Sequence, residues 1–145
     1  MLTCSQIQYM KNAKELNIPV SIEPWLSVVN SVKAVAFYKD AFGAVEVYRM
    51  EDPDGGLVVK LSVNSATFWL SGGSADDASD VSEKVGGGTV RMILTVPDPD
   101  ALFAQALKAG AIQIFPVGEE YGWRLGRLVD PFGLHWEIGH PLHAI

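Results

Sequence analysis

Four side chains near the carboxyl end form the closest group in the sequence that could bind a metal ion: His135, Glu137, His140 and His143. His135 and Glu137 are two positions apart, and residues with this spacing share one face of a β-strand, which suits metal ligands. His140 and His143 instead lie on either side of Pro141 near the chain end, where chains are usually mobile. Two interpretations stay open: a metal site, or a strand histidine followed by a polar tail.

Four aromatic residues could offer a stacking surface to a flat or apolar ligand: Trp25, Trp69, Tyr121 and Trp123. Packing in a core or a dimer interface is the alternative. Tyr121 and Trp123 belong to the sequence EEYGWR, which we expect to form a loop over the mouth of a cleft. Arg124 in this segment could meet an anionic ligand, or could be a structural or solvent-exposed arginine.

The composition is that of a globular protein. The 145 residues are 48% apolar and 19% charged, which excludes a disordered chain. The single cysteine, Cys4, excludes an internal disulfide framework and a multi-cysteine zinc site. No apolar run is long enough for a membrane span or a signal peptide, so we expect a cytoplasmic protein without a membrane partner.

The net charge of -6 argues against a nucleic-acid partner, because such proteins normally carry a basic patch. Half of this charge lies in residues 71–88, a segment with few large apolar residues and glycines at both ends. This composition predicts a solvated linker. The acidity therefore says little about a ligand.

The segments on either side of this linker have the same pattern. The first predicts a strand at 20–29, a helix capped by Asn30 or Ser31 and ended by Gly43, and three strands. These strands lie at 44–50, 57–63 and 66–71. The second predicts a strand at 89–96, a helix from Pro99 to Gly110 capped by Asp98, and strands at 112–117, 124–129 and 134–138.

An offset of 67 or 68 residues superimposes the two segments: Gly43 matches Gly110, and Leu26 matches Leu94. We therefore expect an α+β fold, in which paired βαβββ modules form a cup-shaped mixed sheet with helices on the outer face. The expected organisation is an N-terminal extension at 1–17 and a single domain at 18–145. Within it, module one spans 18–71, the linker 72–88 and module two 89–142.

Alternation along the strands predicts which residues face the helices. Leu26 and Val28 should pack under the first helix, together with Phe68 and Leu70 from the last strand of module one. Trp136 and Ile138 are their counterparts in module two. The opposite face, which would line the concave side of the cup, then carries Glu23, Trp25, Thr67, Trp69, Arg91, Ile93, His135 and Glu137.

The stretches VSIEPWLSVVNSVKAVAFYKDAFGAVEVYRM and EEYGWRLGRLVDPFGLHWEIGHPL resemble the glyoxalase, bleomycin-resistance and extradiol dioxygenase group. This group is the vicinal oxygen chelate superfamily, and the resemblance is to its small bacterial PhnB-like branch. The resemblance implies paired βαβββ modules around a cleft and a homodimer. It leaves the activity open, because this fold serves lyases, isomerases, oxygenases and binding proteins without catalysis.

The resemblance also implies four metal-ligand positions, which in this sequence are Glu23, Trp69, Arg91 and Glu137. An indole does not bind such metals, and a guanidinium would put a fixed positive charge where the metal should lie. Two interpretations of Glu137 stay open: a metal ligand or general base, or an ion pair in which Arg91 lies between Glu137 and Glu23.

The leading hypothesis is a protein that binds a small molecule in the cleft between the modules, without a metal. Its ligand-binding residues would be Glu23, Trp25, Trp69, Arg91, Ile93, Tyr121, Arg124, His135 and Glu137. The alternative is a metal-dependent lyase, isomerase or dioxygenase. In that case Glu137 would be catalytic, and Glu23, His135 and Glu137 would hold one divalent ion.

Overall fold

The computed structural model describes residues 1, 3–6, 21–74 and 90–143. Most of the expected N-terminal extension and most of the expected linker lie outside these residues, so the domain boundaries stay a prediction. None of the helices in the described ranges is long and apolar enough to cross a membrane.

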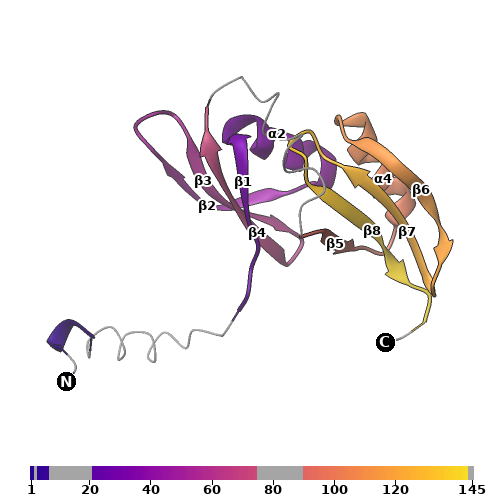
Figure 1. Ribbon diagram of the computed structural model, residues 1–145, viewed down its shortest axis with the longest axis horizontal. Helices are drawn as coiled ribbons and strands as arrows, with labels where there is room; N and C mark the ends of the chain where they lie inside the picture. The colour runs from indigo at the N-terminus through magenta and orange to yellow at the C-terminus, as the bar shows by residue number, and fades with distance from the viewer. Residues whose placement is uncertain (2, 7–20, 75–89, 144–145) are drawn as a thin grey trace.

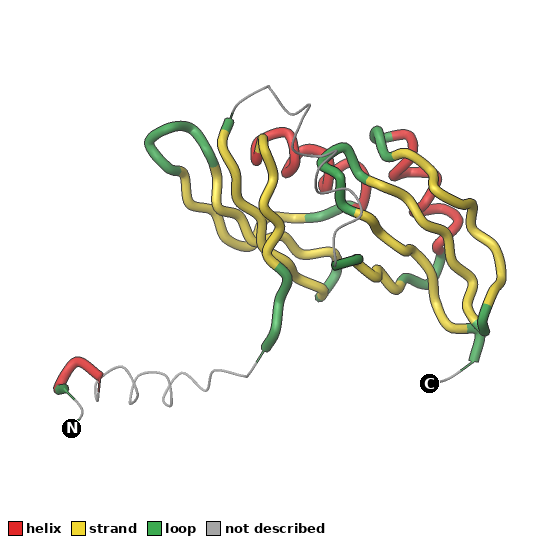
Figure 2. The backbone as a smooth tube through the Cα atoms, viewed as in Figure 1, coloured by secondary structure: helices red, strands yellow, loops and turns green. Residues whose placement is uncertain are grey.

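The described chain forms the expected βαβββ unit twice (Figures 1 and 2). Module one consists of β1 (Trp25–Asn30), α2 (Ser31–Phe42), β2 (Val45–Glu51), β3 (Leu57–Val63) and β4 (Ala66–Gly73). Module two consists of β5 (Met92–Thr95), α4 (Pro99–Lys108), β6 (Ile112–Glu120), β7 (Trp123–Val129) and β8 (His135–Pro141). The two four-stranded sheets lie side by side, and α4 covers one face of the second sheet.

Both sheets have the same mixed topology. The strand orders are β1-β4-β3-β2 and β5-β8-β7-β6, with a parallel first pair and antiparallel pairs after it. Trp25 lies opposite Trp69 in module one, and Ile93 lies opposite Glu137 in module two. Each residue of the second pair is 68 positions after its counterpart, so the strand registers confirm the repeat found in the sequence.

Both helices begin where their capping residues predict, and α2 ends at the predicted glycine, whereas α4 ends at Lys108, before the predicted Gly110. The Asn30 side chain accepts a hydrogen bond from the backbone N–H of Lys33, and Gly43 ends α2 in the left-handed region with φ of 69°. In module two, the Asp98 side chain accepts from the backbone N–H of Ala101, and Pro99 occupies the first turn. These caps set the directions in which the chain enters and leaves each helix.

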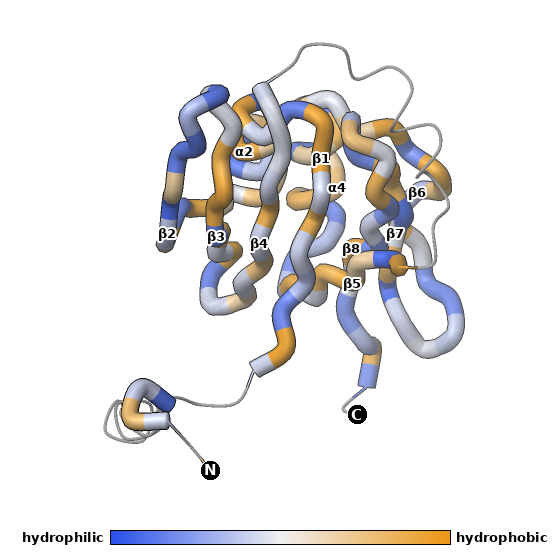
Figure 3. Tube along the Cα trace, turned by 60° about the vertical axis from the view of Figure 1, so that its left-hand side comes forward, coloured by the Kyte–Doolittle hydropathy of each residue, from blue (hydrophilic) through white to orange (hydrophobic). Residues whose placement is uncertain are grey.

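The helix-facing sides of the two sheets meet in one hydrophobic core, as the alternation predicted. Buried positions alternate with exposed or half-buried ones along β1, and the buried hydrophobic positions are orange in Figure 3. The Tyr38 ring of α2 lies 5.3 Å from the ring of Phe68 on β4 and 5.7 Å from that of Trp136 on β8, measured between centroids. Leu70 and Ile138 are fully buried beneath the helices. Because both modules share this core, the opposite sheet faces point away from it.

Asp130 joins the modules by hydrogen bonds. Its Oδ2 accepts from the Tyr38 hydroxyl at 2.5 Å and from Trp136 Nε1 at 2.9 Å, and its Oδ1 accepts from the backbone N–H groups of Phe132 and Leu134. Burial raises the pKa of Asp130, while these donors oppose the shift. The DPFG turn therefore has a structural role: it places a satisfied carboxylate inside the core.

The segment EEYGWR is a tight hairpin between β6 and β7, so the prediction that it forms a loop is wrong. Tyr121 and Gly122 occupy the two turn positions with φ of 53° and 77°. Two positive φ values match a type I′ turn, which suits the twist of a two-residue hairpin. Glu120 and Trp123 already pair in the β-ladder.

Candidate functional site

Most of the sequence-predicted site residues fall into two groups, one on the outward face of each sheet. The group on module one is an aromatic shelf formed by Trp25 and Trp69. Their rings are stacked, with centroids 5.7 Å apart and planes 11° apart. The edge of Tyr48 meets Trp69 at 5.5 Å. Trp25 is 52% exposed although it belongs to a β-strand of the sheet. The shelf therefore offers indole surface to a ligand or a partner.

Glu23 lies at one end of this shelf and is held by three donors. The Thr67 hydroxyl donates a short hydrogen bond to Oε2, Trp69 Nε1 donates to Oε1 at 3.3 Å, and Lys60 Nζ lies 3.2 Å from Oε2. The hydrogen bond from Thr67, with further contributions from Lys60 and Trp69, lowers the pKa of Glu23. The carboxylate is therefore ionised at neutral pH and already carries a positively charged partner.

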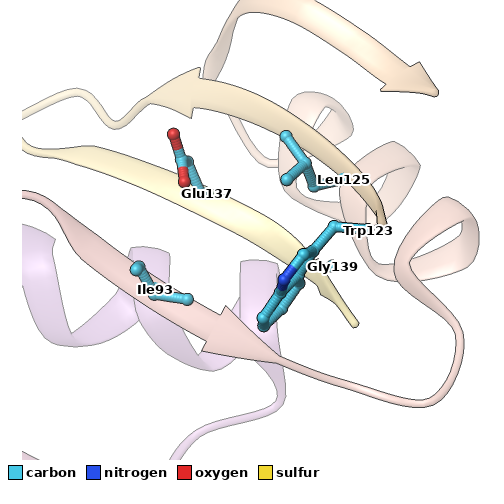
Figure 4. A pocket seen from close by; sticks show the side chains of 5 residues that line it. All are labelled: Ile93, Trp123, Leu125, Glu137 and Gly139. Atoms are coloured by element: carbon cyan, nitrogen blue, oxygen red, sulfur yellow. The ribbon is translucent and has the colours of Figure 1, made fainter. Parts of the chain in front are cut away.

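The group on module two surrounds an apolar pocket of about 240 Å³. Ile93 on β5 and the two β7 residues Trp123 and Leu125 lie on either side of β8, which contributes Glu137 and Gly139 (Figure 4). The pocket follows from strand alternation. Trp123 and Leu125 face outward, whereas Arg124 between them faces α4.

Glu137 forms an ion pair with Arg91, whose Nε lies 3.3 Å from Oε1. This pairing is one of the two interpretations of Glu137 drawn from the sequence, and the structure shows it. That interpretation also placed Arg91 between Glu137 and Glu23, but among the described residues the charged partner of Glu23 is Lys60. Each carboxylate has a separate cation from its own module.

Arg127 and Lys60 also face outward, and the sequence analysis missed both. Arg127 Nε donates to His135 Nδ1 at 3.2 Å. Burial lowers the pKa of His135, and the positive charges of Arg127 and Arg91 lower it further. His135 is therefore neutral at neutral pH and accepts at Nδ1, which places its proton on Nε2.

The repeat itself could have identified these two cations. Lys60 lies opposite Trp69 across the β3–β4 pair, and Arg127 lies opposite Glu137 across the β7–β8 pair. They occupy equivalent positions in the two modules, 67 residues apart. The strand parity that selected Glu137 selects Arg127 as well.

The residues at the four implied metal-ligand positions do not fit a divalent ion. An indole and a guanidinium occupy two of them, and both carboxylates, Glu23 and Glu137, are within salt-bridge distance of a cation. Within residues 21–74 and 90–143, no three His, Cys, Asp or Glu side chains converge closely enough to hold a metal. The alternative set of Glu23, His135 and Glu137 is therefore not brought together in this chain.

Several candidates lie away from both groups. Tyr121 is 95% exposed at the hairpin tip. Arg124 contacts Asp100 of α4 through two hydrogen bonds of 2.7 and 2.5 Å, on the helix side of the sheet. His140 is the β-ladder partner of Arg124 and does not share the outward face of His135 and Glu137. The group of metal-capable residues at the carboxyl end is thus divided between two faces of β8.

A second pocket, of about 250 Å³, lies at the seam between the modules. Pro24, Thr67 and Phe68 line it from module one, and Ile93 and Trp136 are among the residues that line it from module two. Ile93 therefore borders both pockets. Of the predicted ligand-binding residues, it is the one that lies at the junction of the modules.

Comparisons with known proteins agree with this architecture. No known family model matches the chain. An uncharacterized protein of Mycobacterium tuberculosis is 35% identical over an alignment of 147 positions, gaps included. The alignment covers 95% of this chain and 84% of the relative.

Two solved structures share the fold at lower identity. A glyoxylase/bleomycin resistance protein/dioxygenase domain from Frankia has a TM-score of 0.68 at 16% identity, covering 86% of this chain and 98% of the domain. TnmS3, an antibiotic binding protein from Streptomyces, has a TM-score of 0.58 at 20% identity, covering 86% of this chain and 98% of its own.

The repeated βαβββ fold and these similarities lead to one assignment. The chain belongs to one family with the mycobacterial relative, and it has the fold of the glyoxylase/bleomycin resistance protein/dioxygenase domain from Frankia.

Proposed function

We propose that this protein binds a small organic molecule in a cleft between modules, formed by module one of one copy and module two of another, and does so without a metal. The observation that carries the proposal is the state of the four implied ligand positions. Trp69 contributes to a stacked aromatic shelf, Arg91 neutralises Glu137, and Lys60 neutralises Glu23. A site with its charges already paired and aromatic surface exposed suits a flat organic ligand. Antibiotic binding by TnmS3 is consistent with this role.

The shelf and the module-two pocket would act as two halves of one site in a homodimer. They point away from the shared core of one chain, so a second copy is needed to bring a shelf against a pocket. Both halves expose large apolar side chains, Trp25 at 52% and Ile93 at 63%. Burial of these side chains would stabilise such a dimer at about 25 cal/mol per Å² of apolar surface.

Isothermal titration calorimetry with 2-naphthamide and caffeine, two flat neutral probes, tests the binding proposal. We expect at least one probe to bind the untagged full-length protein. Trp25→Ala should weaken that binding about tenfold, the range of one lost stacking contact. Tyr121→Ala is the matched control, because Tyr121 is equally aromatic but lies at the hairpin tip, and it should leave affinity unchanged. Absence of binding by both probes at millimolar concentration would count against the proposal.

Elemental analysis of the same protein distinguishes the metal-dependent alternative. The proposal predicts no stoichiometric nickel, zinc, manganese or iron. A stoichiometric metal that is lost in Glu137→Gln would overturn metal-free binding and favour a lyase, isomerase or dioxygenase that uses Glu137 and Glu23.

A further inference from the structure

At three outward positions that the repeat makes equivalent, module two carries one positive charge more than module one: Arg91, Arg127 and Glu137 stand where module one has Glu23, Lys60 and Trp69. On module one, Lys60 and Glu23 form one pair. On module two, Arg91 and Glu137 form one pair, and Arg127 is a second cation. Within the described residues no carboxylate lies within salt-bridge distance of Arg127. Arg127 is the repeat counterpart of Lys60. In module one that cation pairs with Glu23, whereas in module two Glu137 pairs with Arg91 and not with Arg127.

The guanidinium of Arg127 is held by its inner nitrogen. Nε donates to His135 Nδ1 at 3.2 Å, and no hydrogen bond within the described part of the chain involves its two terminal nitrogens. Two terminal N–H groups side by side match the two oxygens of a carboxylate. His135 thus positions the Arg127 guanidinium so that its two terminal nitrogens are available to an anion.

An apolar pocket lies directly along the same strand face. Trp123, Leu125 and Arg127 alternate along β7, and the first two line the 240 Å³ pocket together with Ile93 and Gly139. This volume exceeds the roughly 150 Å³ cavity that holds benzene and is below the roughly 300 Å³ at which drug-sized sites begin. It suits a body of one or two rings.

We infer that the pocket of module two takes a small organic acid, with its apolar body against Ile93, Trp123 and Leu125 and its carboxylate on the terminal nitrogens of Arg127. This inference rests on the proposed function and names its ligand class. Arg91 compensates the charge of Glu137, so the carboxylate on this face repels an anion only weakly. A cationic ligand would instead meet two arginines.

Calorimetry with three matched probes tests the inference: 2-naphthoate, the neutral 2-naphthamide and the cationic 2-naphthylmethylammonium. All three carry the same ring system, so affinity differences report the charged group. We expect the acid to bind at least about tenfold more tightly than the amide, as for a hydrogen bond to a charged group. Arg127→Gln should abolish this preference and leave the affinity for the amide unchanged.

Lys108→Gln provides the control, because it removes an exposed cation of module two at the end of α4, on the helix-covered side of the sheet. It should leave the acid preference intact. Equal binding of acid and amide, or an equal loss in Arg127→Gln and Lys108→Gln, would overturn the organic-acid inference while small-molecule binding stands. Failure of all three naphthyl probes to bind would overturn the organic-acid inference, and failure of caffeine as well would overturn small-molecule binding.

Discussion

Tyr38 and Asp130 form the buried polar contact that ties α2 of module one to the DPFG turn of module two. The carboxylate is nearly inaccessible to water and accepts four hydrogen bonds. Such a group is tolerated in a core only while its acceptors are satisfied. Removing a donor would therefore leave a buried carboxylate oxygen with one hydrogen bond fewer, and the desolvation cost that this leaves uncompensated exceeds the net energy of the hydrogen bond itself.

Tyr38→Phe should lower the free energy of unfolding by about 1–3 kcal/mol, because it leaves a buried carboxylate with one donor fewer. The pKa of Asp130 is already raised by burial and should rise further. A raised pKa in the folded state means that folding takes up a proton, so the cost should shrink as pH falls through that pKa. Urea unfolding at several pH values measures this.

Tyr48→Phe is the control for this experiment, since Tyr48 is exposed on β2. It should change the unfolding free energy by less than about 0.5 kcal/mol. An equal effect of both substitutions, or a cost for Tyr38→Phe that does not depend on pH, would contradict the role given to Asp130.

At the scale of elements, the β6–β7 hairpin positions Trp123 and Leu125 at the pocket. Its turn requires positive φ at both Tyr121 and Gly122, and only glycine adopts this region without a steric cost. Because the turn contains only two residues and not the longer loop predicted from the sequence, the β-ladder continues to Trp123. This extension is what places the indole at the end of the pocket.

Gly122→Ala should destabilise the protein by about 1–2 kcal/mol through left-handed backbone strain. Gly118→Ala is a well-matched control: an added Cβ meets no heavy atom within 4 Å at either glycine, but Gly118 lacks a positive φ. It should be neutral or slightly stabilising. Thermal unfolding of the two variants decides the point, and equal midpoints would refute a φ-dependent cost.

Most elements were predictable from the sequence because their signals are local. Caps such as Asn30 and Asp98, and alternation such as Leu26 against Trp25, report directly on helix starts and strand faces. EEYGWR failed as a prediction since a non-glycine residue at positive φ, here Tyr121, carries no reliable local signal. The pairing of Glu137 with Arg91 was among the interpretations of the sequence, but the partner of Glu23 was not, because the choice of Lys60 over Arg91 depends on distances across the sheet.

At the scale of the whole molecule, one core serves both modules and leaves their outward faces without a partner within the described chain. The aromatic contacts of Tyr38 with Phe68 and Trp136 span the two sheets. The modules therefore cannot turn their outward faces toward one another without breaking this core. The proposed homodimer would bring the shelf of one copy against the module-two pocket of the other.

Size-exclusion chromatography with light scattering should accordingly give the mass of two 15.7 kDa chains at about 50 μM protein, a concentration suited to an interface of standard size. Ile93→Glu should yield monomers, since it puts a charge on an exposed apolar side chain of the proposed interface. Val32→Glu is the control: it changes an exposed apolar residue as well, but one that lies on α2, and this variant should remain dimeric. A monomeric mass for the unmodified protein would exclude this assembly.

The sequence alone determined the repeated βαβββ plan, the helix caps and the faces of the strands, because each depends on residues within a few positions of one another. The tertiary structure decided which charges pair and which remain available. Glu23 and Glu137 each neutralise a cation of their own module, and Arg127 is left beside an apolar pocket. Such pairing depends on distances of 3–4 Å across strands that are far apart in sequence, and no local pattern encodes it.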